Sequence, residues 1–152
     1  MSVVIYHNPG CGTSRNVLAV LQAAGAAPEV VEYLTTGWTR PQLEALFAGA
    51  GLTPKTALRV SKSPAEAMGL TAEGVTEEDI LAAMLEHPIL VNRPIVVTPK
   101  GVRLCRPSEL VLDLLETLPP GPMYKEDGVL LINAQGNRIS KVYQERTQEI
   151  VV

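Results

Sequence analysis

The chain has few of the residues and sequence runs that mark several common classes of protein. Its 152 residues include only two cysteines, too few for a disulfide framework, and only 4% aromatic residues. No apolar run approaches the roughly 20 residues of a membrane-spanning helix, and no basic region followed by a long apolar stretch opens the chain. The net charge of -3 does not indicate a nucleic-acid partner or an anionic membrane surface. We therefore expect a cytoplasmic protein with reduced cysteines and with no nucleic-acid or membrane partner.

Apolar sequence, in contrast, is plentiful enough for a core. Hydrophobic residues make up 46% of the chain, and a chain of this length buries roughly 68–70% of its unfolded surface as one domain. We expect residues 1–152 to form a single α/β domain. Within it we expect a helical insertion over about residues 38–87 and a C-terminal extension over about residues 119–152.

The most informative segment is a turn over residues 7–14, which reads HNPGCGTS. A short apolar run at residues 3–6 precedes it, and apolar residues at helical spacing follow it from Val17. Strand, turn and helix in this order place Cys11 where a helix begins. The unpaired N–H groups and the positive dipole end of a helix N-terminus favour a thiolate over a thiol. We therefore predict a reactive cysteine rather than a buried structural one.

The neighbours of Cys11 also suit an anion. Gly12 adds no side-chain bulk, so backbone N–H groups can close around an anion at this point. Thr13 and Ser14 supply hydroxyls that can cap the helix or hydrogen-bond the sulfur. His7, at the end of the first strand, is explained about equally well by a structural hydrogen bond and by a role as a base.

The rest of the chain predicts a mixed sheet flanked by helices. Its first strand, helix and second strand form a β-α-β unit, which implies a parallel pair with a right-handed crossover. The remaining pattern predicts a strand over 29–34, helices beginning near 40, 54, 64 and 77, strands over 87–98 and 102–106, a helix over 107–118 and a hairpin over 129–142. Pro94 is unusual inside a central strand and indicates a sheet edge, a bulge or a cis bond. The order of elements matches the thioredoxin-like fold.

Three arginines lie at turns or at the ends of expected elements, where side chains can converge on one pocket. Arg93 precedes the unusual proline, Arg106 lies between hairpin and helix, and Arg59 lies in the helical insertion. Guanidinium groups match tetrahedral oxyanions in geometry and charge and do not lose their protons. Together with a thiolate they would form a site for a phosphate-, sulfate- or arsenate-like ion, provided that Arg59 comes close.

Three segments carry a family resemblance. They read IYHNPGCGTSRN, HPILVNRPIVVTPKG and RLCRPSE, and in this order they resemble the glutaredoxin-linked arsenate reductases. The resemblance spans about residues 3–141 and implies a thioredoxin-like fold. It also implies that arsenate is reduced to arsenite, that glutathione is the co-substrate, and that glutaredoxin is the partner. No tightly bound cofactor is implied, and we expect a monomer.

The same resemblance assigns roles to residues. It implies that Cys11 is the nucleophile that attacks arsenate. It implies one set of substrate-binding residues, which comprises Arg59, Arg93, Arg106, Gly12 and Thr13. The three arginines in this set also count as catalytic, and a supporting pair keeps the sulfur as a thiolate, namely His7 and Ser14. The two histidines and two cysteines lack the spacing of zinc ligands, so we expect no metal site.

Alternative functions differ in what they require of the cysteines. A tyrosine-phosphatase-like reductase needs an arginine six positions after Cys11, where Val17 stands, and a third cysteine. Redox-sensing regulators that bind RNA polymerase tend to carry a C-x-x-C pair, whereas position 14 here is serine. A monothiol oxidoreductase needs only Cys11 but leaves the arginines unexplained. Cys105, in the expected hairpin, is assigned no catalytic role.

Overall fold

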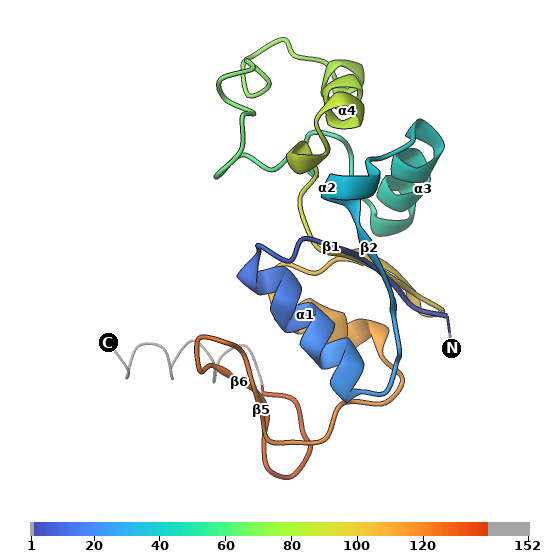
Figure 1. The fold of residues 1–152 in the computed structure, drawn as a ribbon, viewed down its shortest axis with the longest axis vertical. Helices are drawn as coiled ribbons and strands as arrows, with labels where there is room; N and C mark the ends of the chain where they lie inside the picture. The colour runs from blue at the N-terminus through green and yellow to red at the C-terminus, as the bar shows by residue number, and fades with distance from the viewer. Residues whose placement is uncertain (1, 140–152) are drawn as a thin grey trace.

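The computed structural model describes residues 2–139, and its centre is a four-stranded sheet with the order β2-β1-β3-β4 (Figure 1). The strands are β1 (Val4–His7), β2 (Glu29–Glu32), β3 (Ile95–Thr98) and β4 (Gly101–Leu104). β1 pairs in parallel with β2 and antiparallel with β3, which in turn pairs antiparallel with β4. The predicted mixed sheet and its parallel first pair are therefore confirmed.

Helices cover both faces of this sheet. The α-helices are α1 (Gly12–Ala23), α2 (Tyr33–Thr36), α3 (Arg40–Ala50) and α4 (Glu77–Glu86), and the 3-10 helices are η1 (Pro88–Leu90) and η2 (Ser108–Leu114). α1 and η2 lie on one face, and α2, α3 and α4 lie on the other (Figure 1). Among the described residues, no helix is long and apolar enough to cross a membrane.

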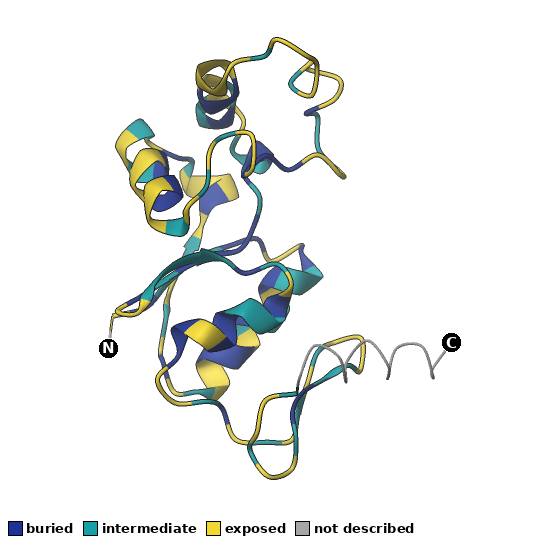
Figure 2. Ribbon diagram, turned by 180° about the vertical axis from the view of Figure 1, so that it is seen from behind, coloured by how far each residue is buried: buried dark blue, intermediate teal, exposed yellow. Residues whose placement is uncertain are grey.

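The two faces have separate apolar clusters because strand side chains alternate between them. Ile5 on β1 and Val96 on β3 are buried with α1 and η2. Their chain neighbours Tyr6 and Ile95 face the other cluster, which packs against α3 and α4. Figure 2 shows the buried residues in these two layers, with the exposed ones on the outer sides of the helices.

Two helices of the insertion begin at capping boxes. The side chain of Thr39 accepts the backbone N–H of Gln42, and the Gln42 side chain accepts the backbone N–H of Thr39. Thr76 and Asp79 make the same reciprocal pair at the start of α4. These contacts satisfy N–H groups that a helix start otherwise leaves unpaired. The predicted helix starts near residues 40 and 77 are confirmed.

The predictions of helices beginning near residues 54 and 64 are wrong, because the chain forms only a single turn at each place. After the turn closed by the Ala57 N–H on the Thr53 carbonyl, the chain pairs with another segment instead of coiling further. Leu58 forms an antiparallel bridge with Val91. The second turn ends at Gly69, whose positive φ of 74° suits glycine but not a continuing helix.

Three further boundaries differ from the predictions. The second strand ends at Glu32 because Tyr33 begins α2, and the third begins only at Ile95, after η1 and a cis Arg93-Pro94 bond. The cis bond, one of three options for Pro94, is confirmed. An edge position is excluded, because β3 has neighbours on both sides. The helix expected over 107–118 is the shorter 3-10 helix η2, because the chain is already extended at Leu115.

The C-terminal extension forms a small separate pair of strands, β5 (Met123–Tyr124) and β6 (Leu130–Ile132). The predicted hairpin is confirmed for its strand Leu130–Ile132 and for the start of its return, because the Ile139 N–H donates to the Leu131 carbonyl at 3.0 Å. The pairing of β6 with β5 was not predicted. A single bridge joins Ile132 to Arg138, and residues 140–142 of the prediction lie outside the described residues. β6 buries Leu131 and Ile132 against the α1 side of the core, so the extension closes that layer.

Candidate active site

Cys11 is the N-cap residue of α1, directly after the turn that follows β1. Its backbone N–H donates to the Asn8 carbonyl at 3.0 Å, and the Asn8 side chain accepts the Gly10 N–H at 2.9 Å. These two bonds fix the turn, so that the Cys11 side chain stands over the first N–H groups of the helix. The sequence prediction of strand, turn and helix around Cys11 is confirmed.

The surroundings of the Cys11 sulfur favour its charged form. Burial alone raises the pKa of the thiol, but the Ser14 N–H, the Arg93 charge, the Arg106 hydrogen bond and the Thr13 N–H all lower it. The net direction is downward from the ordinary value. A thiolate at this position is therefore stabilised from two sides, by backbone N–H groups and by guanidinium groups.

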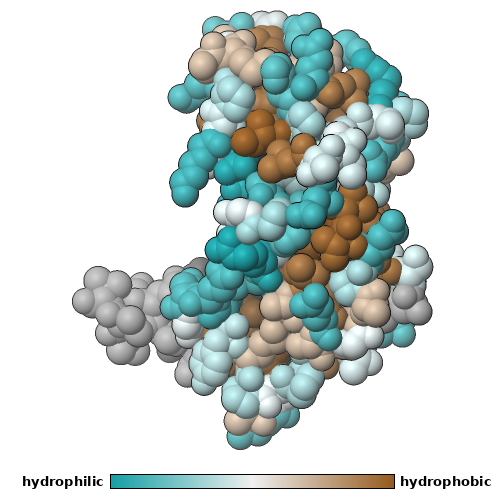
Figure 3. All heavy atoms as spheres, in the orientation of Figure 1, coloured by the Kyte–Doolittle hydropathy of each residue, from teal (hydrophilic) through white to brown (hydrophobic). Residues whose placement is uncertain are grey.

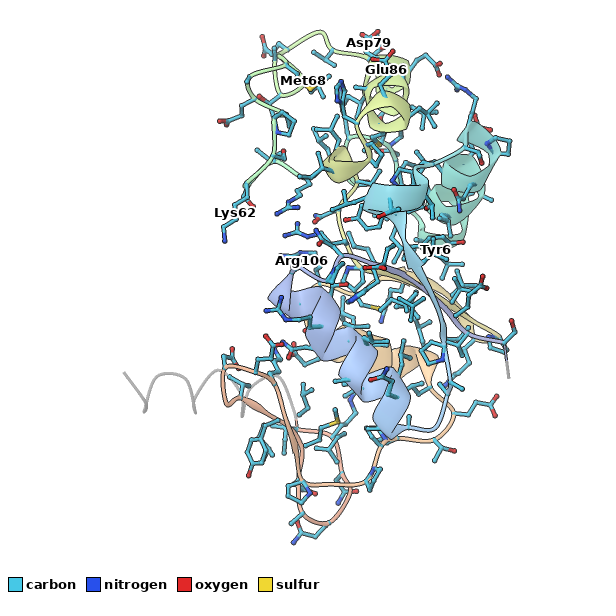
Figure 4. The ribbon with its side chains drawn as sticks, viewed as in Figure 1. Tyr6, Lys62, Met68, Asp79, Glu86 and Arg106 are labelled. Atoms are coloured by element: carbon cyan, nitrogen blue, oxygen red, sulfur yellow. The ribbon has the colours of Figure 1, made fainter. Side chains whose placement is uncertain are left out.

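Two arginines reach Cys11 from the strands on the other side of the pocket. Arg106 follows β4, and its Nη1 lies 3.6 Å from the Cys11 sulfur and donates to the Arg93 carbonyl at 3.2 Å. Arg93 precedes β3, is only 7% exposed, and donates from Nη1 to the Asn92 side chain. Arg106 thus bridges the sulfur and the backbone of the second arginine. Figure 4 shows Arg106 beside the N-terminal end of α1.

Arg59 comes from the insertion and joins the same site. The Leu58–Val91 bridge and the Arg59 N–H bond to the Leu90 carbonyl, at 2.8 Å, tie its backbone to the segment that leads into Arg93. Burial lowers the pKa of Arg59, and the neighbouring charge of Arg93 lowers it further. The three arginines therefore converge as predicted. Hydrophilic side chains gather at the waist between the insertion and α1, where the outline is hollowed on the left of Figure 3.

His7 and Ser14 are buried and hydrogen-bonded to each other. Ser14 Oγ lies 2.6 Å from His7 Nδ1 and accepts the Asn8 N–H at 3.1 Å. Burial lowers the pKa of His7, while Glu32 opposes and Arg15 adds to this effect. The hydroxyl of Ser14 is thus engaged in hydrogen bonds within the turn. The part of Ser14 that stabilises the sulfur is its backbone N–H.

Gly12 and Thr13 open α1, and the tip of the C-terminal extension lies beside them. Arg15 holds Glu126 with two hydrogen bonds, of 2.8 and 3.0 Å, and also donates to the Pro9 carbonyl. A Cβ atom on Gly12 would lie 3.5 Å from Glu126 Oε2, in ordinary contact. The sequence did not predict this neighbour, because Glu126 is 111 positions from Arg15.

The second cysteine has different surroundings. Cys105 is fully buried, and burial raises the pKa of its thiol to about 12. Such a thiol stays protonated and is a poor nucleophile. Within residues 2–139, no group of three or more histidine, cysteine or acidic side chains could hold a metal ion.

Two residues that the sequence analysis did not single out also face this site. Asn8 shapes the turn, as described above, and Tyr33 lies where the charges of Arg93, Arg59 and Cys11 act on its pKa. An asparagine in a turn and a tyrosine at the end of a strand are common in proteins. Neither residue can therefore be identified as part of a functional site from the sequence alone. Only the fold, which sets the start of α2 near the turn, brings them together.

Comparison with known proteins places this geometry in a family. The model of the ArsC family matches residues 6–114. The chain belongs to the ArsC family. The match contains Cys11, Arg59, Arg93 and Arg106 and stops before the β5–β6 pair.

Individual ArsC relatives are similar over nearly the whole chain. "Arsenate reductase ArsI2" of Synechocystis sp. is 64% identical over 137 residues, which cover 90% of this chain and 98% of that protein. "Arsenate reductase" of Escherichia coli (strain K12) is 45% identical over 138 residues, with 91% and 98% covered. The solved structure of "Arsenate reductase from Vibrio cholerae" has a TM-score of 0.71 at 40% identity and covers 76% of this chain and 98% of that one. The fold and the resemblance read from the sequence are confirmed.

Proposed function

We propose that this chain reduces arsenate to arsenite, with the Cys11 thiolate as nucleophile and with glutathione and glutaredoxin as the source of electrons. The observation that carries the proposal is the position of the Cys11 sulfur, at the start of α1 and 3.6 Å from Arg106 Nη1. Membership of the ArsC family, with relatives named arsenate reductase at 45% and 64% identity, supports the choice of arsenate.

The first step forms a bond between sulfur and arsenic. Arsenate exchanges its oxygen ligands readily, so the Cys11 thiolate displaces one hydroxyl group, which takes up a proton from solvent and leaves as water. Arg59, Arg93 and Arg106 balance the negative charge of the remaining oxygens as this charge develops. The N–H groups at the start of α1, those of Gly12 and Thr13, add hydrogen bonds to the same anion.

The second step reduces arsenic with a pair of electrons from thiols. A glutathione thiolate attacks the Cys11 sulfur, the sulfur–arsenic bond breaks, and its electron pair stays on arsenic. Arsenic(V) thereby becomes arsenic(III), which takes up protons and leaves as arsenite. A glutaredoxin thiolate then attacks the glutathione sulfur of the mixed disulfide, and Cys11 leaves again as a thiolate. The reaction needs no tightly bound cofactor, and we place it in the cytoplasm, where glutathione is available.

His7 and Ser14 act indirectly in this scheme. Their hydrogen bond, together with the Asn8 N–H on Ser14 Oγ, holds the turn in which Cys11 lies. This turn also orients the backbone N–H of Ser14 toward the Cys11 sulfur. We therefore propose positioning roles for both side chains.

Consumption of NADPH, coupled through glutathione reductase, glutathione and glutaredoxin, tests the proposal. We expect arsenate-dependent turnover by the wild type, none above background by Cys11→Ser, and wild-type turnover by the matched variant Cys105→Ser. Turnover should fall to background when glutaredoxin is omitted. Folded wild type without arsenate-dependent turnover would refute arsenate reduction, and turnover that persists without glutaredoxin would refute the electron source.

The alternative functions agree less well with the site. In a C-x-x-C sensor, position 14 would be the second thiol, but Ser14 is buried and bonded to His7 and Asn8. A monothiol oxidoreductase would use Cys11 but has no need of three converging arginines. Reduction of a glutathionylated peptide at a rate that the arginines do not affect would favour the oxidoreductase.

A further inference from the structure

Tyr33, the first residue of α2, has a side chain held rigidly against the insertion. The residue is 1% exposed, and its ring is stacked on that of Trp38, with centroids 5.0 Å apart and planes at 23°. Tyr6 of β1 packs against the same Trp38, with centroids 5.3 Å apart. The ring of Tyr33 therefore has little freedom, and the position of its hydroxyl is fixed by the fold.

The hydroxyl of Tyr33 is buried without a hydrogen bond. No residue among 2–139 lies in normal hydrogen-bond geometry with it, although the Asn8 side chain is near enough to lower its pKa. Buried polar groups in folded proteins nearly always have a partner, so a group without one calls for an explanation. The Nε of Arg93 is a second buried donor without a partner among these residues.

The groups that surround this hydroxyl are those of the active site. Arg93, Arg59 and the Cys11 sulfur all act electrostatically on Tyr33, and the side chain of Asn8 lies beside it. Two of these neighbours are guanidinium groups, which bind oxyanions. The unpartnered hydroxyl therefore points to the place that an oxyanion would occupy.

We propose that the Tyr33 hydroxyl binds the substrate directly, by donating a hydrogen bond to one oxygen of the arsenate held by Cys11, Arg59 and Arg93. This inference rests on the proposed reduction of arsenate. It adds an uncharged hydrogen-bond donor to the residues that bind the arsenate ion. The same oxygen, or its neighbour, would accept the free Nε–H of Arg93.

A neutral donor is useful at this point because the site is already crowded with positive charge. The charge of Arg93 lowers the pKa of Arg59, which shows that the two guanidinium groups repel each other. Burial raises the pKa of Tyr33, so its hydroxyl keeps its proton near pH 7 and acts as a donor. Tyr33 thus adds a hydrogen bond to the anion without adding to the repulsion between the arginines.

Tyr33→Phe removes only the oxygen and keeps the ring against Trp38. The readout is the arsenate concentration that halves the rate at which iodoacetamide alkylates Cys11, measured without added thiol. We expect this concentration to rise about 10- to 100-fold in Tyr33→Phe, the size of one lost hydrogen bond to a charged group. Alkylation without arsenate should stay within about twofold of the wild type, because the residues that lower the Cys11 pKa remain.

Tyr6→Phe is the matched control, since it removes a hydroxyl from the other tyrosine that packs on Trp38. We expect wild-type protection by arsenate in this variant. A half-protecting concentration in Tyr33→Phe equal to that of the wild type would overturn the proposal. Wild-type turnover, assayed on the same preparations, separates this failure from a failure of arsenate reduction itself.

A measurement on the wild type covers the case in which Tyr33→Phe unfolds. Arsenate added to the wild-type protein should produce a near-ultraviolet tyrosine difference spectrum, because the hydroxyl gains an acceptor. The spectrum should persist in Tyr6→Phe. Protection of Cys11 by arsenate with no tyrosine signal in either protein would also overturn the proposal.

Discussion

The two sides of the pocket are built in different ways. The sulfur side consists of residues 7–14, in which the Asn8 turn and the first N–H groups of α1 fix Cys11. The arginine side combines Arg59 with Arg93 and Arg106, from segments that meet only in the folded chain. One side is therefore local and resistant to changes elsewhere, whereas the other depends on long-range pairing. Both sides lower the pKa of Cys11, but the contribution of the first side depends only on residues close in sequence, whereas that of Arg93 and Arg106 depends on the whole fold.

Removing a guanidinium next to the sulfur should have the largest effect of the changes considered below. We expect Arg93→Ala or Arg106→Ala to lower kcat/KM for arsenate by about 10²–10³-fold, the usual effect of losing a group that stabilises developing charge. The Arg93→Lys variant should also be impaired, since an ammonium group cannot make the bidentate hydrogen bonds that a guanidinium group makes to an oxyanion. Arg103→Ala is the matched control, because Arg103 pairs with Asp113 at an exposed position of β4. Turnover that equals the wild type would remove the substituted arginine from the site.

Arg59 should separate anion binding from thiol activation. Arg93 and Arg106 are among the main groups that lower the pKa of Cys11, whereas Arg59 and Cys11 share only a weaker charge interaction. Arg59→Ala should therefore weaken arsenate turnover about 10-fold or more and move the pH profile of Cys11 alkylation less than Arg106→Ala does. Arg106→Ala should move the same profile to higher pH. Equal shifts in both variants would show that the pocket does not divide in this way.

Ser14→Ala tests whether the hydroxyl or the backbone of Ser14 acts on the sulfur. The backbone N–H remains and the Asn8 bonds still hold the turn, so the pH profile of Cys11 alkylation should move less than in Arg106→Ala. Because His7 Nδ1 and the Asn8 N–H lose a buried partner, we expect the free energy of unfolding to fall by about 1–3 kcal/mol in urea titrations. A profile shifted upward with unchanged stability would instead assign the effect to the hydroxyl.

Cys105→Ala should have the smallest effect on turnover. Its thiol is fully buried with a pKa of about 12, so it stays protonated and does not take part in exchange. We expect wild-type kcat/KM and a loss of about 1 kcal/mol in unfolding free energy from the removed core atom. Mass spectrometry after oxidation with glutathione should find the adduct on Cys11. A disulfide between Cys11 and Cys105 would contradict this account.

The sequence predicts the local parts of the molecule well. The turn around Cys11 and the capping box at Thr39 depend on contacts within a few residues, and both are present. The cis bond before Pro94 was one of three options, and only the position of β3 inside the sheet excludes an edge strand. Convergence of the arginines was conditional on Arg59, because nothing near Arg59 in the sequence specifies its partner.

The predictions fail where distant segments compete with local preference. The turn that begins at Thr53 does not extend into a helix, because Leu58 pairs with Val91. That pairing is also what carries Arg59 to the site. Tyr33 reads as part of a strand, yet it begins α2 and turns its ring onto Trp38. In each case the contact that determines the structure is a tertiary contact that cannot be predicted from a single sequence.

The most direct test of the account is the rate at which iodoacetamide alkylates Cys11 as a function of pH, followed by the mass of the peptide that contains it. The N–H groups of α1 together with Arg93 and Arg106 outweigh the effect of burial, and the pKa of Cys11 is lowered. The account predicts an inflection below the ordinary value of about 8.5 for a cysteine thiol. An inflection at or above that value would contradict it, because the site would then hold a thiol rather than the thiolate that attacks arsenate.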